Sequence, residues 1–308
     1  MKIHSCLTLI TISILCLWIN ESTAAAKLRV VTTTQDIAAL VKEVGGDLVK
    51  VESIARGYQD AHYIEARPSY MLKVNRADLL IYQGLELEIG WLPLLIQGGR
   101  NLKVLPGRPG NLDLSSSILP LEIPRGEVDR SMGDIHPLGN PHYHLDPENG
   151  VFMAQAIADR LEDLDAENAG TYRDRLGHFI ERLTKKIEGW KKRLEKFRSP
   201  KVVTYHKTWS YFLKRFGITR VGTIEPIPGV PPTPRHLTTL AKLMKNQHTR
   251  VILQANYFET KFSGMLAQKT GAVVLSLPVS VGGAAEAADY ISLFDTLVTS
   301  LENGLSNP

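Results

Sequence analysis

The spacing of apolar residues near the start of the chain predicts strands that alternate with helices. Runs such as LRVVTTT and ADLLIYQG are typical of buried strands, whereas QDIAALVKEVGG repeats its apolar residues at helical spacing and ends in glycine. The predicted strands are 28–34, 48–55, 77–84 and 101–107, and the predicted helices are 35–46 and 68–77. Strands and helices in alternation favour a parallel sheet with helices on both faces.

One helix is predicted to be much longer than the others. Residues 166–197 repeat apolar side chains at steps of three or four, which marks one face of an amphipathic helix. These positions are Tyr172, Leu176, Phe179, Leu183, Ile187, Trp190, Leu194 and Phe197. Roughly 30 residues at ~1.5 Å per residue give a rod of about 45 Å, which is enough to run along a whole domain.

The alternation of strands and helices returns after Pro200. The predicted strands are 201–206, 219–226, 249–256 and 272–279, and the predicted helices are 208–217, 234–246 and 261–271. The predicted fold class is therefore α/β, with two lobes that each hold a parallel sheet flanked by helices and that are joined by one long rigid helix. We expect an N-terminal lobe at 27–145, a helical region at 146–199 and a C-terminal lobe at 200–308.

Residues 1–26 have the layout of a secretory signal peptide. Lys2 precedes an apolar run from Leu7 to Ile19, and the small residues at 24–26 favour cleavage before Lys27. The apolar run is shorter than the about 20 residues that a membrane-spanning helix needs. We therefore expect an exported, periplasmic protein.

Composition is typical of a soluble globular protein and gives no sign of nucleic-acid binding. Apolar residues make up 44% of the chain and charged residues 22%, and the net charge of +4 comes from basic residues interspersed with acidic ones. Both cysteines, Cys6 and Cys16, fall inside the predicted signal peptide. Any metal held by the mature protein would therefore be bound through imidazole and oxygen.

Three histidines lie where open α/β sheets bind ligands. His62 follows the strand predicted at 48–55, His206 ends the strand at 201–206, and His142 lies in the loop that leaves the first lobe. Ligands in such sheets bind beyond the carboxyl ends of the strands, so these residues are expected where the two lobes face each other. His136 and His144 flank His142. The sequence holds no H-E-x-x-H, G-x-S-x-G or P-loop motif.

Four segments resemble the periplasmic metal-binding proteins of zinc and manganese ABC importers, in order and over almost all of the mature chain. They are DAHYIEARPSYMLKVNRADLLIYQGLELE, NPHYHLDPEN, VVTYHKTWSYFLKRFGI and IEPIPGVPPTPRHL. The resemblance implies that His62, His142 and His206 bind the metal, and that a carboxylate close to a C-terminal tyrosine completes the set. Asp289, directly before Tyr290, is the residue that fits this description.

The chain departs from the family pattern at three positions. Ala61 stands where the family usually has proline, and His144 stands where it usually has tryptophan, so His142 and His144 are alternative ligands. Asp289 abuts its tyrosine, whereas the family more often has one residue between the two. The alternatives for the fourth ligand are Asp295, Glu225 and a water molecule.

Three neutral imidazoles and one carboxylate favour Zn²⁺, which binds nitrogen at about 2.0–2.1 Å in a tetrahedron. Mn²⁺ is less favoured because it prefers oxygen, and manganese-binding relatives commonly have a carboxylate at the position of His206. The resemblance implies a solute-binding protein that delivers the metal to an inner-membrane ABC permease and its ATPase. We expect a monomer without enzyme activity, whose metal affinity falls as the pH drops through about 6.5.

Two other classes of function use the same residues. A secreted zinc hydrolase also needs three protein ligands and a water molecule, with Glu65 or Glu225 as the candidate base, although no spacing supports either residue. A manganese- or iron-binding member of the same family, or a surface adhesin with this fold, is the other alternative.

Overall fold

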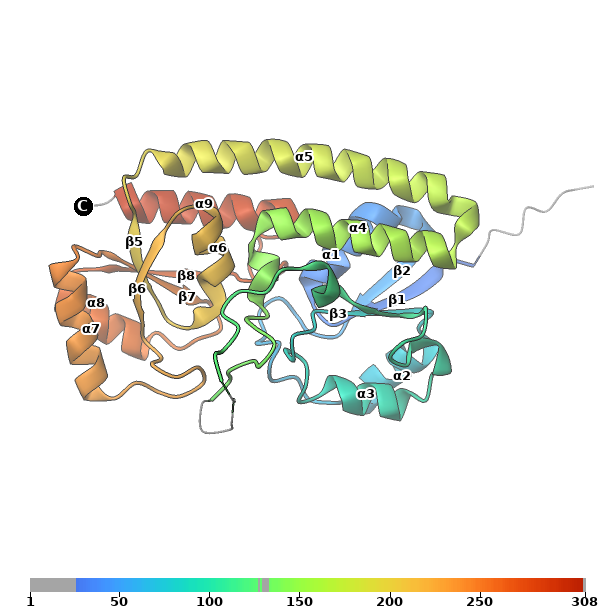
Figure 1. Ribbon diagram of the computed structural model, residues 1–308, viewed down its shortest axis with the longest axis horizontal. Helices are drawn as coiled ribbons and strands as arrows, with labels where there is room; N and C mark the ends of the chain where they lie inside the picture. The colour runs from blue at the N-terminus through green and yellow to red at the C-terminus, as the bar shows by residue number, and fades with distance from the viewer. Residues whose placement is uncertain (1–25, 127, 129–132, 307–308) are drawn as a thin grey trace, which may run out of the picture.

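The computed structural model describes residues 26–126, 128 and 133–306, and two parallel sheets form its framework (Figure 1). The predicted signal peptide, apart from Ala26, lies outside the described residues, as do both cysteines. The first sheet has the order β2-β1-β3-β4 and the second has the order β6-β5-β7-β8. The fold class is thus the predicted one, with a lobe around each sheet.

Helices cover both faces of the first sheet. Its strands are β1 (Leu28–Thr32), β2 (Val49–Ser53), β3 (Leu79–Tyr82) and β4 (Asn111–Asp113). Its helices are α1 (Gln35–Gly45), α2 (Pro68–Arg76) and α3 (Leu92–Gly99). Neighbouring residues of β3 face opposite sides: Leu79 packs in the cluster that contains α1, and Leu80 packs in the cluster that contains α2 and α3. Figure 1 shows α1 on one side of this sheet and α2 and α3 on the other.

The second sheet repeats this layout at the other end of the molecule. Its strands are β5 (Lys201–Thr204), β6 (Thr219–Thr223), β7 (Val251–Ala255) and β8 (Val273–Leu277). Its helices are α6 (Ser210–Arg215), α7 (Pro234–Asn246) and α8 (Lys261–Thr270). All pairs of neighbouring strands in both sheets are parallel, so the carboxyl ends of the strands in each sheet point to one edge.

Three further helices run along one side of the molecule. They are α4 (Pro147–Leu164), α5 (Ala169–Glu195) and α9 (Tyr290–Ser306). The predicted apolar stripe of the long helix is buried from Tyr172 to Leu194. In Figure 1, α5 extends over both lobes and α9 lies beneath it, and Arg193 of α5 pairs with Glu302 of α9. Within the described part of the chain, no helix has the length and apolar content that a bilayer crossing requires.

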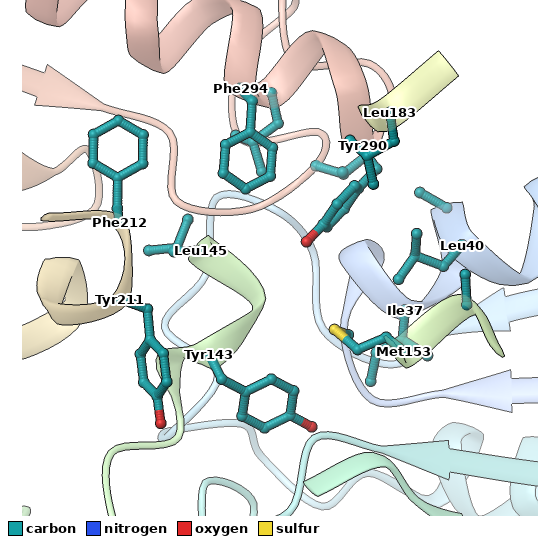
Figure 2. Packing of buried hydrophobic residues seen from close by; sticks show 14 of the residues in the cluster. Ile37, Leu40, Tyr143, Leu145, Met153, Leu183, Tyr211, Phe212, Tyr290 and Phe294 are labelled. Carbon is teal, nitrogen blue, oxygen red and sulfur yellow. The ribbon is translucent and has the colours of Figure 1, made fainter. Parts of the chain in front are cut away.

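A single apolar core joins the two lobes. It includes Ile37 and Leu40 of α1, Phe212 of α6, and Tyr290 and Phe294 of α9. Figure 2 shows these side chains around one centre, together with Tyr143 and Leu145 from the 3₁₀ turn at His142–Leu145. Because this cluster is continuous, moving the lobes far apart would expose it to water.

The predicted fourth strand at 101–107 is wrong. This stretch contains the 3₁₀ turn Leu102–Val104, and the Asn101 side chain accepts a hydrogen bond from the backbone N–H of Lys103 at 3.0 Å. The fourth strand is β4, only three residues long, whose partner is β3. Sequence analysis also missed α3 and α9. The former has proline at its start and two glycines at its end, which are loop signals.

Candidate metal centre

Three of the four predicted ligands lie close together between the lobes. The ring centroid of His142 is 5.2 Å from that of His62 and 5.7 Å from that of His206, and the His62 and His206 centroids are 6.2 Å apart. Imidazoles that share one zinc ion at about 2.0–2.1 Å place their ring centroids roughly 5 Å apart. The three rings are thus close to the separation that a common ion requires.

A fourth histidine, His136, stands beside them. Its ring centroid is 5.3 Å from that of His62, and the Nε2 atoms of the two rings are 3.2 Å apart. Sequence analysis noted His136 only as a neighbour of His142. His136, His142 and His206 line one small cavity, and His62 and His142 line a second, so His142 borders both.

Carboxylates hold two of these imidazoles from outside the cluster. Nδ1 of His62 donates to Asp60 at 2.6 Å, and Nδ1 of His206 donates to Glu225 at 2.8 Å. Such outer carboxylates fix the tautomer and the ring orientation of histidines that bind metals. Both rings therefore have Nε2 as the nitrogen for an ion.

His142 supplies a buried nitrogen with no partner. Its side chain lies 5% exposed, and among the described residues no group forms a hydrogen bond with its Nε2. Buried polar atoms are nearly always paired, so an unpaired one calls for an explanation such as an ion. Burial lowers the pKa of His142 well below its usual value, and the nearby His62 and His206 lower it further. The ring is therefore neutral, as a metal ligand must be.

The donor atoms need a small rearrangement before they can bind an ion. Among residues 26–126, 128 and 133–306, no group of three or more histidine, cysteine, aspartate or glutamate side chains already stands in a geometry that holds a metal. The contact between Nε2 of His62 and Nε2 of His136 must open, because both nitrogens point at each other.

Both ring nitrogens of His144 are already used. Its Nδ1 accepts a hydrogen bond from the Gln83 amide at 3.1 Å, and its Nε2 donates to the carbonyl oxygen of Val279 at 3.0 Å. This pattern is that of a neutral imidazole with a structural role. Of the two alternatives from the sequence, His142 is therefore the one available to a metal.

We expect His144→Ala to weaken the fold while sparing metal binding. The change removes one of the two acceptors of the Gln83 amide nitrogen and the donor to the Val279 carbonyl, at about 1–3 kcal/mol for each buried group. Denaturant unfolding would measure the loss of stability, and elemental analysis would measure the metal content. Loss of the metal from a variant that is still folded would instead make His144 a ligand.

Asp289, the predicted fourth ligand, does not lie with the histidines. It is exposed, and its carboxylate accepts a hydrogen bond at 2.8 Å from the backbone N–H of Ser292 in the first turn of α9. Asp289 lines two cavities together with Glu43. Among the described residues that line these two cavities, none is one of the four histidines. The neighbouring Tyr290 is buried and donates to the carbonyl of His144, which turns Asp289 toward solvent.

The two alternative carboxylates have other partners. Asp295 accepts hydrogen bonds from Lys186 at 2.6 Å and from the Trp190 indole at 2.8 Å, on the side of the molecule formed by α5 and α9. Among the described residues, Glu225 has one hydrogen bond with the cluster, from Nδ1 of His206, and it also accepts from the backbone N–H of Gly229. Neither residue takes the place predicted for Asp289.

Comparisons with known proteins agree with the fold. Residues 30–304 match the family model described as zinc-uptake complex component A, periplasmic. The manganese ABC transporter substrate-binding lipoprotein PsaA of Streptococcus pneumoniae is 29% identical over 75% of this chain and 72% of its own length. The metal ABC transporter substrate-binding lipoprotein FimA of Streptococcus parasanguinis is 25% identical over 93% of this chain and 92% of its own.

Solved structures give the same result for the fold. The crystal structure of ZnuA superposes with a TM-score of 0.78 at 24% identity, covering 91% of this chain and 100% of ZnuA. The manganese-bound periplasmic metal-binding protein from Candidatus Liberibacter asiaticus gives a TM-score of 0.75 at 22% identity, covering 91% of this chain and 100% of the other. Together with the family match, this means that the chain belongs to the zinc-uptake component A family, the metal substrate-binding proteins of ABC importers.

Proposed function

We propose that this protein captures zinc in the periplasm and delivers it to its importer, with His62, His142 and His206 as ligands. The observation that carries the proposal is the cluster of imidazoles between the lobes, with centroids 5.2 to 6.2 Å apart. The carboxylates of Asp60 and Glu225 bind Nδ1 of His62 and His206, which leaves Nε2 of each of these rings as the nitrogen for an ion. A site whose available donor atoms are imidazole nitrogens, while its carboxylates bind the opposite ring nitrogens, suits zinc better than manganese.

Two carboxylates strengthen the imidazoles as ligands. Burial raises the pKa of Asp60, but its hydrogen bonds with His62 and the charge of that imidazole outweigh burial and hold the pKa below its usual value. Asp60 is therefore ionised when it accepts the Nδ1 proton of His62. An ionised acceptor makes the opposite nitrogen a better electron donor to a metal.

A carrier function suits the surroundings of the site better than hydrolysis does. Of the two candidate bases, Glu65 is a surface residue paired with Arg67, and the Glu225 carboxylate is engaged by His206. The continuous core between the lobes favours small shifts of loops and side chains over a wide hinge closure. Capture and release would then depend on local movements at the site.

We also propose a membrane partner for the protein and a periplasmic location. The cargo would pass to an inner-membrane permease driven by an ATPase, as the family assignment implies. Export would use the signal peptide predicted at residues 1–26, and we propose lobes at 27–145 and 200–308 on either side of a helical region, in a monomer.

Competitive metal titration tests the choice of ion. The metal-free mature chain is expected to bind one zinc ion and to prefer zinc over manganese by at least about 100-fold, because the ligands are nitrogen. Elemental analysis would give the stoichiometry, and His62→Ala serves as the matched variant with impaired binding. Tighter binding of manganese than of zinc would make the protein a manganese carrier, and turnover of a hydrolase substrate that depends on His206 would make it an enzyme.

A further inference from the structure

Residues 133–136 lie against both lobes at the site. The hydroxyl of Tyr63, next to His62, donates to the carboxylate of Asp134. The backbone N–H of Asp134 donates to the carbonyl oxygen of Pro228 in the second lobe at 3.0 Å. A single residue, Asp134, therefore connects the loop that carries His62 with the loop that follows Glu225.

The glycine at 229 makes room for this connection. Its φ is +75°, and a Cβ atom there would come within 2.4 Å of the Asp134 carboxylate. A larger residue at this position would both strain the backbone and displace the carboxylate. The loop after Glu225 is thus shaped to receive Asp134.

His136 has the same environment as the three proposed ligands. Its Nε2 faces Nε2 of His62 at 3.2 Å. Burial lowers the pKa of its ring, and the nearby backbone of Leu85 offsets part of that effect. Together with His142 and His206, His136 lines one small cavity of the cluster.

The turn at Leu85, whose backbone lies near His136, is unusual. Leu85 and Glu86 have φ of +50° and +64°, although neither is glycine. Two successive residues in this region cost conformational energy, and such backbone is kept where the surrounding structure requires it. Buried Glu88 holds the turn by accepting hydrogen bonds from the backbone N–H groups of Gln83 at 2.8 Å and Gly84 at 3.1 Å.

We infer that His136 is the fourth ligand of the metal and that Asp134 holds it in place by joining the two lobes. This inference rests on the proposed function and completes it. The ion would have four imidazoles and no carboxylate in contact with it, which is a stronger bias toward zinc than three imidazoles and an oxygen. Because His136 lies on an irregular segment, it can leave the ion without disturbing either sheet. Residues 133–136 would therefore control how fast the ion is released.

X-ray absorption spectroscopy of the zinc-loaded mature protein tests the coordination. We expect four imidazoles around zinc in the wild type, and three in His136→Ala, with one zinc still bound per chain and an affinity lowered about 10-fold or more. Three imidazoles and an oxygen in both proteins would overturn this inference and leave the proposed function standing. Failure of the wild type to bind zinc would overturn both.

Release kinetics test the role of Asp134. Tyr63→Phe removes the hydroxyl that donates to Asp134, and Tyr58→Phe is the matched control, because Tyr58 is a nearby tyrosine with a side chain 63% exposed. We expect zinc release to a chelator to be about 5-fold or more faster in Tyr63→Phe than in Tyr58→Phe, with four imidazoles retained in both. Equal release rates would refute the proposed role of Asp134.

Discussion

Replacing His142 with alanine is expected to lower zinc affinity by more than about 100-fold, because this residue borders both cavities and supplies the buried nitrogen without a partner. Loss of an outer partner of a ligand already costs about 10–100-fold, and loss of a ligand should cost more. Isothermal or competitive titration of the metal-free protein would measure the change. His62→Ala and His206→Ala are expected to behave in the same way.

The control for this experiment is His178→Ala. His178 is exposed on α5 and takes no part in the cluster, so the variant should bind zinc as the wild type does. Circular dichroism of the His142→Ala protein would establish that it is folded. A folded His142→Ala protein with unchanged affinity and stoichiometry would show that the imidazole cluster is not the metal site.

The positions of His62 and His206 could be predicted because they follow from strand topology. His206 comes two residues after the end of β5, and His62 lies in the loop after β2, at the edge where parallel strands end. His136 could not be predicted in this way. It lies in a stretch without periodicity, and nothing in its local sequence says that Tyr63 and Pro228, both distant in the chain, hold its segment at the cluster.

The position of Asp289, away from the histidines, has a simple physical origin. Adjacent residues at the start of a helix point in different directions, and burial decides which of them faces inward. Tyr290 buries a large ring and donates a hydrogen bond to the His144 carbonyl, so it takes the inward position and Asp289 faces water. The sequence alone shows that the two residues are neighbours and leaves their directions open.

The errors in the fold also arise where local signals are weak. The run at 101–107 has the apolar character of a strand, yet β4 is the polar triplet Asn111–Asp113, which forms because β3 offers it a free edge. In contrast, α5 was predictable over nearly its full length, because its stripe of apolar residues is buried against α4 and α9. A long periodic pattern therefore predicts its secondary structure, whereas tertiary packing determines which structure a short apolar run adopts.

Buried titratable groups give the metal-free protein a stability that falls as the pH drops from 6 to 5. Burial, and then the nearby imidazoles, lower the pKa of His136 to about 4 and that of His142 well below its usual value. The unfolded chain therefore takes up protons on these histidines before the folded chain does. Each histidine then removes about 1.4 kcal/mol of stability per pH unit of acidification.

Glu88 acts in the opposite direction over the same range. Burial raises its pKa to about 7, against the hydrogen bonds from Thr33, Gln83 and Gly84, so the folded chain binds this proton first. Acidification through this range therefore stabilises the fold by about 1.4 kcal/mol per pH unit. Two histidines against one glutamate leave a net loss of about 1.4 kcal/mol per pH unit.

Denaturant unfolding of the metal-free chain between pH 6 and 5 would measure these slopes. The slope of the unfolding free energy against pH should roughly double in Glu88→Gln, because the group that opposes the histidines is gone. It should nearly vanish in His142→Asn, because only one histidine is then left to oppose Glu88. Slopes are compared because each substitution also changes the absolute stability. Equal slopes of the unfolding free energy against pH in His142→Asn and the wild type would mean that the fold does not keep His142 neutral. The buried site would then lack the neutral imidazole that a metal ion needs.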